Sequence, residues 1–206
     1  CPLDHVHQAR AQGGPDRGGE RGEHEDPAGD AAREPQPEAD RRQITGVFTD
    51  IDDTLTTDGV VPPSTVQALA DLKAAGLHVI PITGRPVGWS EPFARDWPVD
   101  AIVAENGAVA LTTSPTGLQP APALRGALSK LYQQSDAVRA ANFARMQQVA
   151  QRVLRDVPGA RLARDSAGRE TDIAIDHSEF AHLTPAQVEA VVRPMQAEGM
   201  TATVSS

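Results

Sequence analysis

Residues 47–55, with the sequence VFTDIDDTL, decide the fold of this chain. A short apolar run ends abruptly in three carboxylates and a hydroxyl. Such a cluster does not stabilise a buried strand, because like charges repel and each charge resists the loss of water. It suits a divalent cation held among carboxylates. It suits equally a pair in which one carboxylate is a nucleophile and the other a general acid/base.

The spacing of these carboxylates has a geometric meaning. In an extended strand, residues two apart point to the same side, so Asp50 and Asp52 can share one site while Asp53 points away. A solvated turn is the alternative interpretation, although the nine-residue pattern is much rarer than Asp-x-Asp alone. An EF-hand loop beginning at Asp50 is excluded, because its sixth and twelfth positions need Gly and Glu and are here Leu55 and Val61.

A strand–helix–strand unit is predicted around this motif. Residues 44–50 and 77–82 are rich in β-branched and apolar side chains and are predicted to be strands. Between them, a capping box at residues 64–67 opens a helix that Gly76 closes. A right-handed crossover makes the two strands parallel. Their C-terminal ends then lie at one edge of the sheet, where α/β folds bind ligands.

Further polar residues reach the same edge. The hydroxyl of Thr83 can donate to a phosphoryl oxygen, and Gly84 allows the backbone to approach closely, whereas Arg85 either pairs with an anion or braces the site. The alternatives are a helix N-cap for Thr83 and a structural ion pair for Arg85. A third strand at 101–104 leads to Asn106, which forms a tight turn and is a candidate for contact with the site.

Three of these segments resemble the haloacid dehalogenase (HAD) superfamily. Residues 47–55 resemble its first motif, Asp-x-Asp-x-Thr, and residues 82–86 (ITGRP) resemble its second. Residues 105–108 (ENGA) are similar to an element of the branch with a large cap, type IIB, which includes sugar-phosphate phosphatases. The resemblance implies a magnesium-dependent phosphomonoester hydrolase that forms an aspartyl-phosphate.

The resemblance also implies roles for single residues. Asp50 would be the nucleophile, Asp52 the general acid/base, and Thr54 would steady the turn after the strand. Mg²⁺ would bind Asp50 and the backbone carbonyl of Asp52. Thr83, Gly84, Arg85 and Asn106 are the candidate substrate-binding residues, as argued above from their positions.

The fold class expected from these features is α/β, with a Rossmann-like parallel sheet core and an inserted α+β cap, incomplete at the C-terminus. Residues 1–43 lack aromatic side chains and have few branched aliphatic ones, so a disordered acidic tail is predicted. Residues 44–112 are assigned to the first part of the core and 113–206 to the cap.

The cap is predicted from its own pattern. A helical stretch over about 127–156 is followed by two short strands, 160–164 and 171–175. A capping box at 184–187, with Pro at the first helical position, opens a last helix, and a final strand begins at Thr201. Polar residues near the predicted hairpin are candidates for sugar contacts, although a solvated hairpin explains them equally well; they are Arg164, Arg169, Glu170 and Asp172.

Two elements of the family's site have no counterpart in this sequence. They are the lysine of the third motif and the acidic fourth motif, and the lysines present, Lys73 and Lys130, lie elsewhere. Residues 1–206 are therefore expected to carry the first half of the site and to be inactive alone. A phosphomutase of the same superfamily, a metal-dependent glycosyltransferase and a non-catalytic remnant stay open as alternatives.

Composition narrows the class of partner. The formal net charge of −9 disfavours a general nucleic-acid binder, and no apolar run approaches the ~20 residues of a membrane-spanning helix. The single cysteine, Cys1, excludes an intrachain disulfide, so a cytoplasmic location is expected. The expected partner is a small phosphorylated substrate, with Mg²⁺ as cofactor and neither nucleic acid nor membrane.

Overall fold

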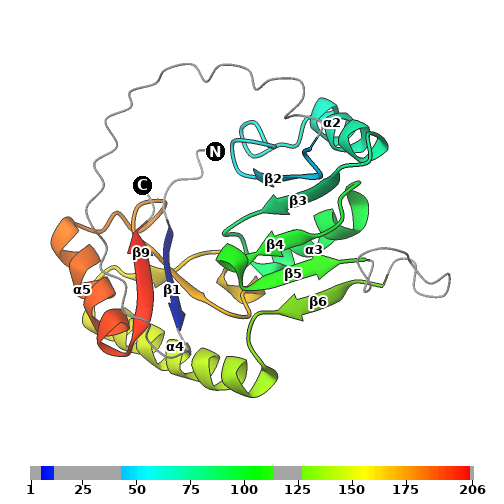
Figure 1. The fold of residues 1–206 in the computed structure, drawn as a ribbon. Coiled ribbons are helices and arrows are strands. Elements are labelled where there is room, and N and C mark those ends of the chain that lie inside the picture. Colours follow the sequence, from blue (N-terminus) through cyan, green and yellow to red (C-terminus); the bar gives the residue numbers. More distant parts are fainter. Residues whose placement is uncertain (1–5, 12–42, 114–126, 205–206) are drawn as a thin grey trace.

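The computed structural model describes residues 6–11, 43–113 and 127–204, and of residues 6–11 it describes the backbone. The described chain forms two sheets with helices (Figure 1). One has five strands in the order β2-β3-β4-β5-β6, and the other has four in the order β7-β8-β1-β9. The predicted α/β class is confirmed.

The five-stranded sheet is mixed. Strands β2 (Gly46–Asp50), β3 (His78–Ile82) and β4 (Ile102–Ala104) are parallel, and β5 (Val109–Thr112) and β6 (Ser129–Tyr132) continue the sheet antiparallel. The predicted parallel core is confirmed over β2, β3 and β4, and β5 and β6 add an antiparallel part to it. The cause is the short turn η1 (Glu105–Gly107), which reverses the chain so that β5 pairs with the strand before it.

Helix α2 (Pro63–Ala74) joins β2 to β3 as predicted, but it begins differently. Pro63 is its first residue, and no side chain caps its N-terminus, so the capping box at 64–67 is not formed. Proline suits this position because its fixed φ is helical and the missing N–H has no partner there in any case. Gly76, at φ +83°, ends the helix as predicted.

The two faces of this sheet differ. Helix α2 packs against β3, and α3 (Val87–Asp96) packs against β4 and β5. On that side Val79, Ile102 and Leu111 are fully buried. The other side, which we call the open face, carries Phe48, Ile82 and Leu131, which are 66%, 37% and 57% exposed. Within the described residues no helix covers the open face, and Asp50 lies two residues after Phe48 on the same side.

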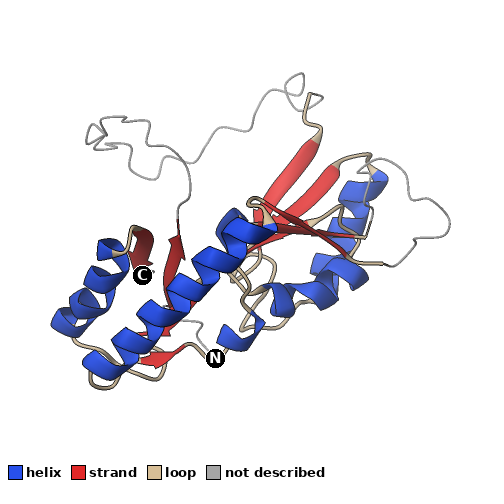
Figure 2. Ribbon diagram, turned by 90° about the horizontal axis from the view of Figure 1, so that it is seen from below, coloured by secondary structure: helices blue, strands red, loops and turns tan. Residues whose placement is uncertain are grey.

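The five-stranded sheet with α2 and α3 forms the first unit of the chain. The second unit contains the four-stranded sheet, and most of it follows the first unit in the sequence. Helix α4 (Asp136–Asp156) leads to the hairpin of β7 (Arg161–Leu162) and β8 (Ile173–Asp176), and α5 (Pro185–Ala197) leads to β9 (Met200–Val204). Figure 2 shows the two helices beside the strands, and side chains of both join one buried cluster with β8 and β9. The capping box at Thr184 is present as predicted. Within the described residues, no helix is long and apolar enough to cross a membrane.

Two segments correct the predicted boundaries. Residues 129–132, predicted as helix and assigned to the cap, form β6 and pair with β5, so the first unit extends to Tyr132. Val6–Ala11, assigned to the disordered tail, form β1 between β8 and β9. In both cases the segment is a strand because it pairs with a strand that is distant in the sequence. Local composition carries no information about such pairing. The remainder of the predicted tail, except Gln43, lies outside the described residues.

Candidate active site

The ends of β2 and β3 bring the predicted residues together. Asp50 is the last residue of β2, and Thr83 follows β3 directly. The two strands pair in parallel with Asp50 opposite Ile82, so both end at the same edge of the sheet. The Thr83 hydroxyl donates to a carboxylate oxygen of Asp52 at 3.3 Å. The predicted meeting of the two motifs is present in the structure.

Arg85 is paired with Asp52. Its Nε lies 3.1 and 3.3 Å from the two carboxylate oxygens, and its Nη2 lies 3.0 Å from one of them. The guanidinium also lies over the ring of Trp89, 5.4 Å from its centroid. The backbone N–H of Arg85 donates to the Thr83 hydroxyl at 3.0 Å. Of the two interpretations from the sequence, the structure therefore shows the bracing ion pair.

Asp50 has a different environment. Loss of hydration at the strand end raises the pKa of its carboxyl group, and the negative charges of Asp52 and Asp53 raise it further, although a hydrogen bond from the Ile51 N–H partly offsets both. Asp50 remains exposed on the open face. Within the part of the chain that the structure describes, Arg85 balances the charge of Asp52, and no such partner is found for Asp50.

The turn after β2 is held by Thr56. Its hydroxyl accepts the N–H of Asp53 at 3.0 Å and donates to the carbonyl of Ile51 at 3.3 Å, and it is buried. Thr54 is exposed and contributes only its backbone N–H, 3.4 Å from the same carbonyl. The predicted structural role of Thr54 in the turn therefore belongs to Thr56. Both residues are threonines close to the motif, and only the path of the turn distinguishes them.

Two of the residues predicted to contact the substrate, Gly84 and Asn106, form backbone hydrogen bonds in the structure. The N–H of Asn106 donates to the carbonyl of Thr83 at 3.2 Å, which places η1 beside the site, while its side chain is exposed. Asn106 adopts a left-handed conformation, which asparagine tolerates well. The carbonyl of Gly84 accepts a hydrogen bond from Arg169 at 3.3 Å.

The fit of a divalent cation depends on the donors at the end of β2. Asp50 offers an exposed carboxylate with uncompensated negative charge, which is the kind of ligand that Mg²⁺ takes together with water and phosphate oxygens. Among the described residues, no group of three or more acidic, histidine or cysteine side chains is placed to hold a metal. The residues present therefore fit a site of few protein ligands.

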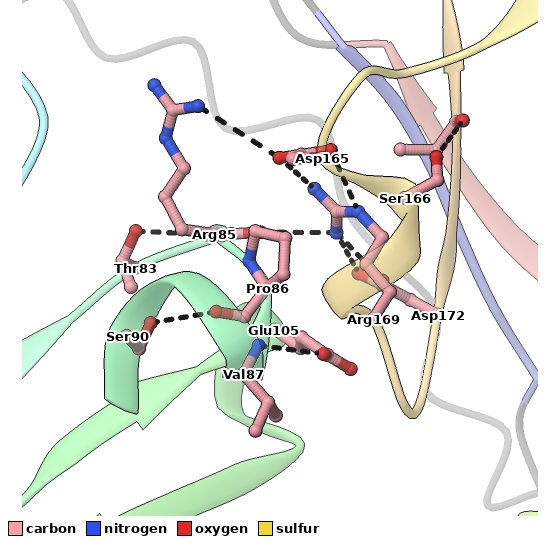
Figure 3. Close-up of polar contacts among 12 residues, drawn as sticks. Thr83, Arg85, Pro86, Val87, Ser90, Glu105, Asp165, Ser166, Arg169 and Asp172 are labelled. Carbon is pink, nitrogen blue, oxygen red and sulfur yellow. Dashed lines mark hydrogen bonds and ion pairs between the residues drawn. The ribbon is translucent and has the colours of Figure 1, made fainter. Parts of the chain in front are cut away.

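Glu105 is a central residue that the sequence analysis did not single out (Figure 3). Its side chain is fully buried. It accepts the N–H groups of Val87, Glu170 and Thr171 at 3.0, 2.9 and 2.7 Å, and also the hydroxyl of Thr171. One carboxylate thus joins the start of α3 to the second unit. Its φ of +48° is unusual for this residue type and marks a constrained position.

Arg169 and Asp172, considered above for sugar contacts, form a buried ion pair instead. Each side chain is 2% exposed, and Nη1 of Arg169 lies 2.8 and 3.0 Å from the two oxygens of Asp172. Burial raises the pKa of Asp172 to about 6, although the Arg169 guanidinium acts in the opposite direction. These side chains have no freedom to bind a substrate while the pair is formed.

This shift predicts a pH dependence of stability. The carboxyl of Asp172 ionises near 3.8 in the unfolded chain and near 6 in the folded one, so between these values the folded state holds more protons and stability falls as pH rises. Wild type should lose about 2 kcal/mol more than Asp172→Asn between pH 4 and pH 7. Urea unfolding at both pH values measures this difference. The exposed Asp136→Asn variant should follow wild type, and an Asp172→Asn variant that also follows wild type would contradict the assignment.

Both lysines are engaged away from Asp50. Lys73 pairs with Asp100 at 2.6 Å. Lys130 pairs with Glu91 at 2.8 Å and with Glu170 at 2.6 Å, and these hydrogen bonds raise the pKa of Lys130 although its burial opposes them. Asp50 is not a partner in any of these ion pairs.

Comparison of whole structures supports the fold. A structure from Thermoplasma acidophilum is 14% identical to this chain, and its TM-score is 0.54. The match covers 76% of this chain and 58% of the Thermoplasma chain. The present chain thus spans little more than half of that protein. A phosphatase of the haloalkanoate (HAD) enzyme superfamily from Bacteroides thetaiotaomicron is 15% identical, with 79% and 77% covered and a TM-score of 0.30. A likeness this weak implies nothing about activity.

The sequence comparison finds a family that resembles part of the chain. No match is found among curated proteins. Residues 47–119, which contain β2, α2, β3, α3, β4 and β5, match the haloacid dehalogenase-like hydrolases. The matched segment includes both carboxylates, Thr83, Arg85 and Glu105. Over residues 47–119, about a third of its length, the chain is therefore similar to the haloacid dehalogenase-like hydrolases.

Proposed function

We propose that this protein is a Mg²⁺-dependent phosphatase that hydrolyses a small phosphorylated metabolite, a sugar phosphate or a related compound, through an aspartyl-phosphate. The observation that carries the proposal is the meeting of Asp50, Asp52, Thr83 and Arg85 at the ends of two neighbouring parallel strands. Clustered carboxylates beside a hydroxyl and a guanidinium suit phosphoryl transfer, in which positioning and charge stabilisation supply most of the rate.

The first half of the reaction uses both carboxylates. The Asp50 carboxylate attacks phosphorus in line, forming an acyl-phosphate bond as the bond to the leaving oxygen breaks. Asp52 donates a proton to that oxygen, so that the substrate leaves as a neutral alcohol. Arg85 holds the Asp52 carboxylate in place for this transfer.

In the second half, water replaces the alcohol. Asp52, now deprotonated, accepts a proton from the water as its oxygen attacks the acyl-phosphate. Inorganic phosphate leaves and the Asp50 carboxylate is restored. When bound, Mg²⁺ would be held by the Asp50 carboxylate and the backbone carbonyl of Asp52, and it would offset negative charge on the phosphoryl group.

Substrate contacts are assigned to the loop after β3 and to η1. Thr83 would exchange its bond to Asp52 for one to a phosphoryl oxygen, and Gly84 leaves room for the phosphate to approach. Asn106, exposed beside Thr83, would contact the substrate. The ion pair of Arg85 with Asp52 favours bracing as its principal role.

Thr83→Val tests the assigned hydroxyl. The change keeps the shape of the side chain but removes the donor, so kcat/KM for phosphate release should fall about 10- to 100-fold. Thr57→Val, which alters an exposed threonine in the turn after β2, serves as a matched control and should retain nearly full activity. Equal kcat/KM in Thr83→Val and wild type would remove Thr83 from the site.

Residues 1–206 are expected to be inactive alone. The ion pairs formed by Lys73 and Lys130 leave neither lysine to neutralise Asp50 and a phosphate dianion. We therefore propose that full turnover needs a further cation and a further carboxylate beside Asp50. Activity should accordingly be compared between residues 1–206 and a form extended past Ser206.

The experiment that tests the proposal is phosphate release from a panel of sugar phosphates with Mg²⁺. The products separate the proposal from its nearest alternative, because a phosphomutase returns an isomeric sugar phosphate and releases little inorganic phosphate. Magnesium-dependent release by the extended form supports the proposal. If both forms are inert towards the whole panel, or if the phosphate is only moved within the sugar, the hydrolase assignment fails.

A further inference from the structure

The second unit reaches the candidate site through one short turn. This turn, η3 (Ser166–Gly168), follows Asp165 and lies against the loop after β3 (Figure 3). The two backbones touch directly, because a Cβ on Gly88 would lie 3.1 Å from the Cα of Gly168. No larger side chain fits there unless the turn moves away.

Arg85 is shared across this junction. Its Nε and Nη2 bind Asp52 of the first unit, while its Nη1 lies 4.0 Å from a carboxylate oxygen of Asp165. The planar guanidinium presents donors on more than one side, so one arginine can serve two carboxylates. The side chains of Arg85 and Asp165 are 20% and 21% exposed, so solvent screens the contact less than it screens a pair at the surface.

Asp165 is itself fixed from behind. Arg169 donates to its two oxygens through Nη2 at 3.1 Å and Nε at 3.4 Å. Arg169 is held in turn by the buried Asp172 and by the carbonyl of Gly84. The charges therefore alternate along one row, which runs through Asp52, Arg85, Asp165, Arg169 and Asp172.

This row leaves Asp165 little capacity for a direct substrate contact. Both of its oxygens accept from Arg169, and one of them also faces Arg85. Its surroundings suit a residue that fixes a neighbour. The neighbour on the side of the site is Arg85, and the group that Arg85 fixes is Asp52.

We propose that Asp165 is a positioning residue, through which the second unit orients Arg85 and thereby Asp52. Docking of the η3 turn is then a condition for full turnover, although no residue of the turn need touch the reacting atoms. The kinetic part of this inference rests on the proposed function, whereas the contact itself can be measured without turnover.

The contact is tested by thermal unfolding of residues 1–206. Arg85→Met and Asp165→Asn should each lower Tm, and the double variant should lower it by clearly less than the sum, because each change removes the same interaction. Glu189→Gln, which alters an exposed ion pair on α5, combined with Arg85→Met should give a simple sum. If Asp165→Asn does not fold, Asp165→Ser, which also removes the charge, takes its place in the cycle. Tm shifts that add fully would overturn the proposal.

The kinetic consequence is tested in the form that releases phosphate. Asp165→Asn should lower kcat about 10-fold and leave KM within about twofold, because Asp52 is misplaced while the substrate contacts stay. Asp165→Glu, which keeps the charge, should recover most of the rate, and Asp165→Asn should have no further effect in an Arg85→Met background. A change in KM alone, or an equal loss in both backgrounds, would overturn the positioning role.

The two tests separate this inference from the proposed function. If no substrate is turned over, the proposed function fails while the Tm cycle still decides whether Asp165 and Arg85 are coupled. If turnover depends on Asp50 but the Tm shifts are additive, the proposed function stands and the positioning role falls.

Discussion

Asp50→Asn should reduce Mg²⁺-dependent phosphate release by at least about 1000-fold in the form of the protein that turns over. The amide is nearly the same size as the carboxylate but is a poor nucleophile, so the acyl-phosphate cannot form, and removal of a nucleophile typically costs this much or more. The loss should appear in kcat, with little change in Tm, because Asp50 is exposed and its strand neighbours are unaffected. Steady-state release of phosphate measures the effect.

Asp53→Asn is the matched control for this prediction. It makes the same chemical change three positions away in the same motif, and Asp53 is exposed with φ +56°, a conformation that asparagine accepts. Its activity should stay within about threefold of wild type, since no reacting group is lost. Comparable losses in both variants would show a general effect of charge at this strand end and would remove the special role of Asp50.

Glu105→Ala should destabilise the protein by about 3–5 kcal/mol. Three backbone N–H groups and one hydroxyl lose their acceptor in a fully buried position, and each unsatisfied donor is costly. Because two of those N–H groups belong to Glu170 and Thr171, the variant should also loosen the link between the two units. Urea unfolding measures the free energy, and hydrogen exchange of residues 165–172 measures the loosening.

Two further variants calibrate the Glu105 prediction. Glu105→Gln keeps one oxygen as an acceptor but directs an amide towards Thr171, so an intermediate loss is expected. Glu189→Ala removes an exposed glutamate from a helix surface and should change stability by less than about 0.5 kcal/mol. A loss below about 1 kcal/mol in Glu105→Ala would contradict the central place given to this carboxylate.

The sequence was sufficient where local pattern and topology agree. Asp50 and Thr83 are 33 residues apart, yet a parallel βαβ unit brings both to one sheet edge, and the structure has them there. The capping box at Thr184 could be predicted because its hydrogen bonds join residues only three positions apart. The rings of Trp89, Phe93 and Trp97 lie side by side, with centroids 4.7 Å apart, because a spacing of four places them on one face of α3 and its C-cap.

The features that could not be predicted depend on contacts between residues that are far apart in the sequence. Glu105 accepts donors from residues 65 and 66 positions later, so nothing in its own segment marks it as buried. In the sequence Arg169 and Asp172 resemble surface charges, but in the fold they form a buried ion pair and Arg169 also donates to the carbonyl of Gly84, 85 positions earlier. β6 and β1 owe their form to strands that they meet only in the folded protein.

The central claim is that phosphate passes through a covalent bond to Asp50, and trapping that bond tests it most directly. The protein is mixed with Mg²⁺ and a sugar phosphate that it hydrolyses, and the reaction is quenched in acid. Treatment with borohydride then reduces an aspartyl-phosphate to homoserine. The proposed chemistry predicts homoserine at position 50 and at no other aspartate, as read by peptide mass spectrometry. Phosphate release without homoserine at position 50, or homoserine at the position of another aspartate, would contradict it.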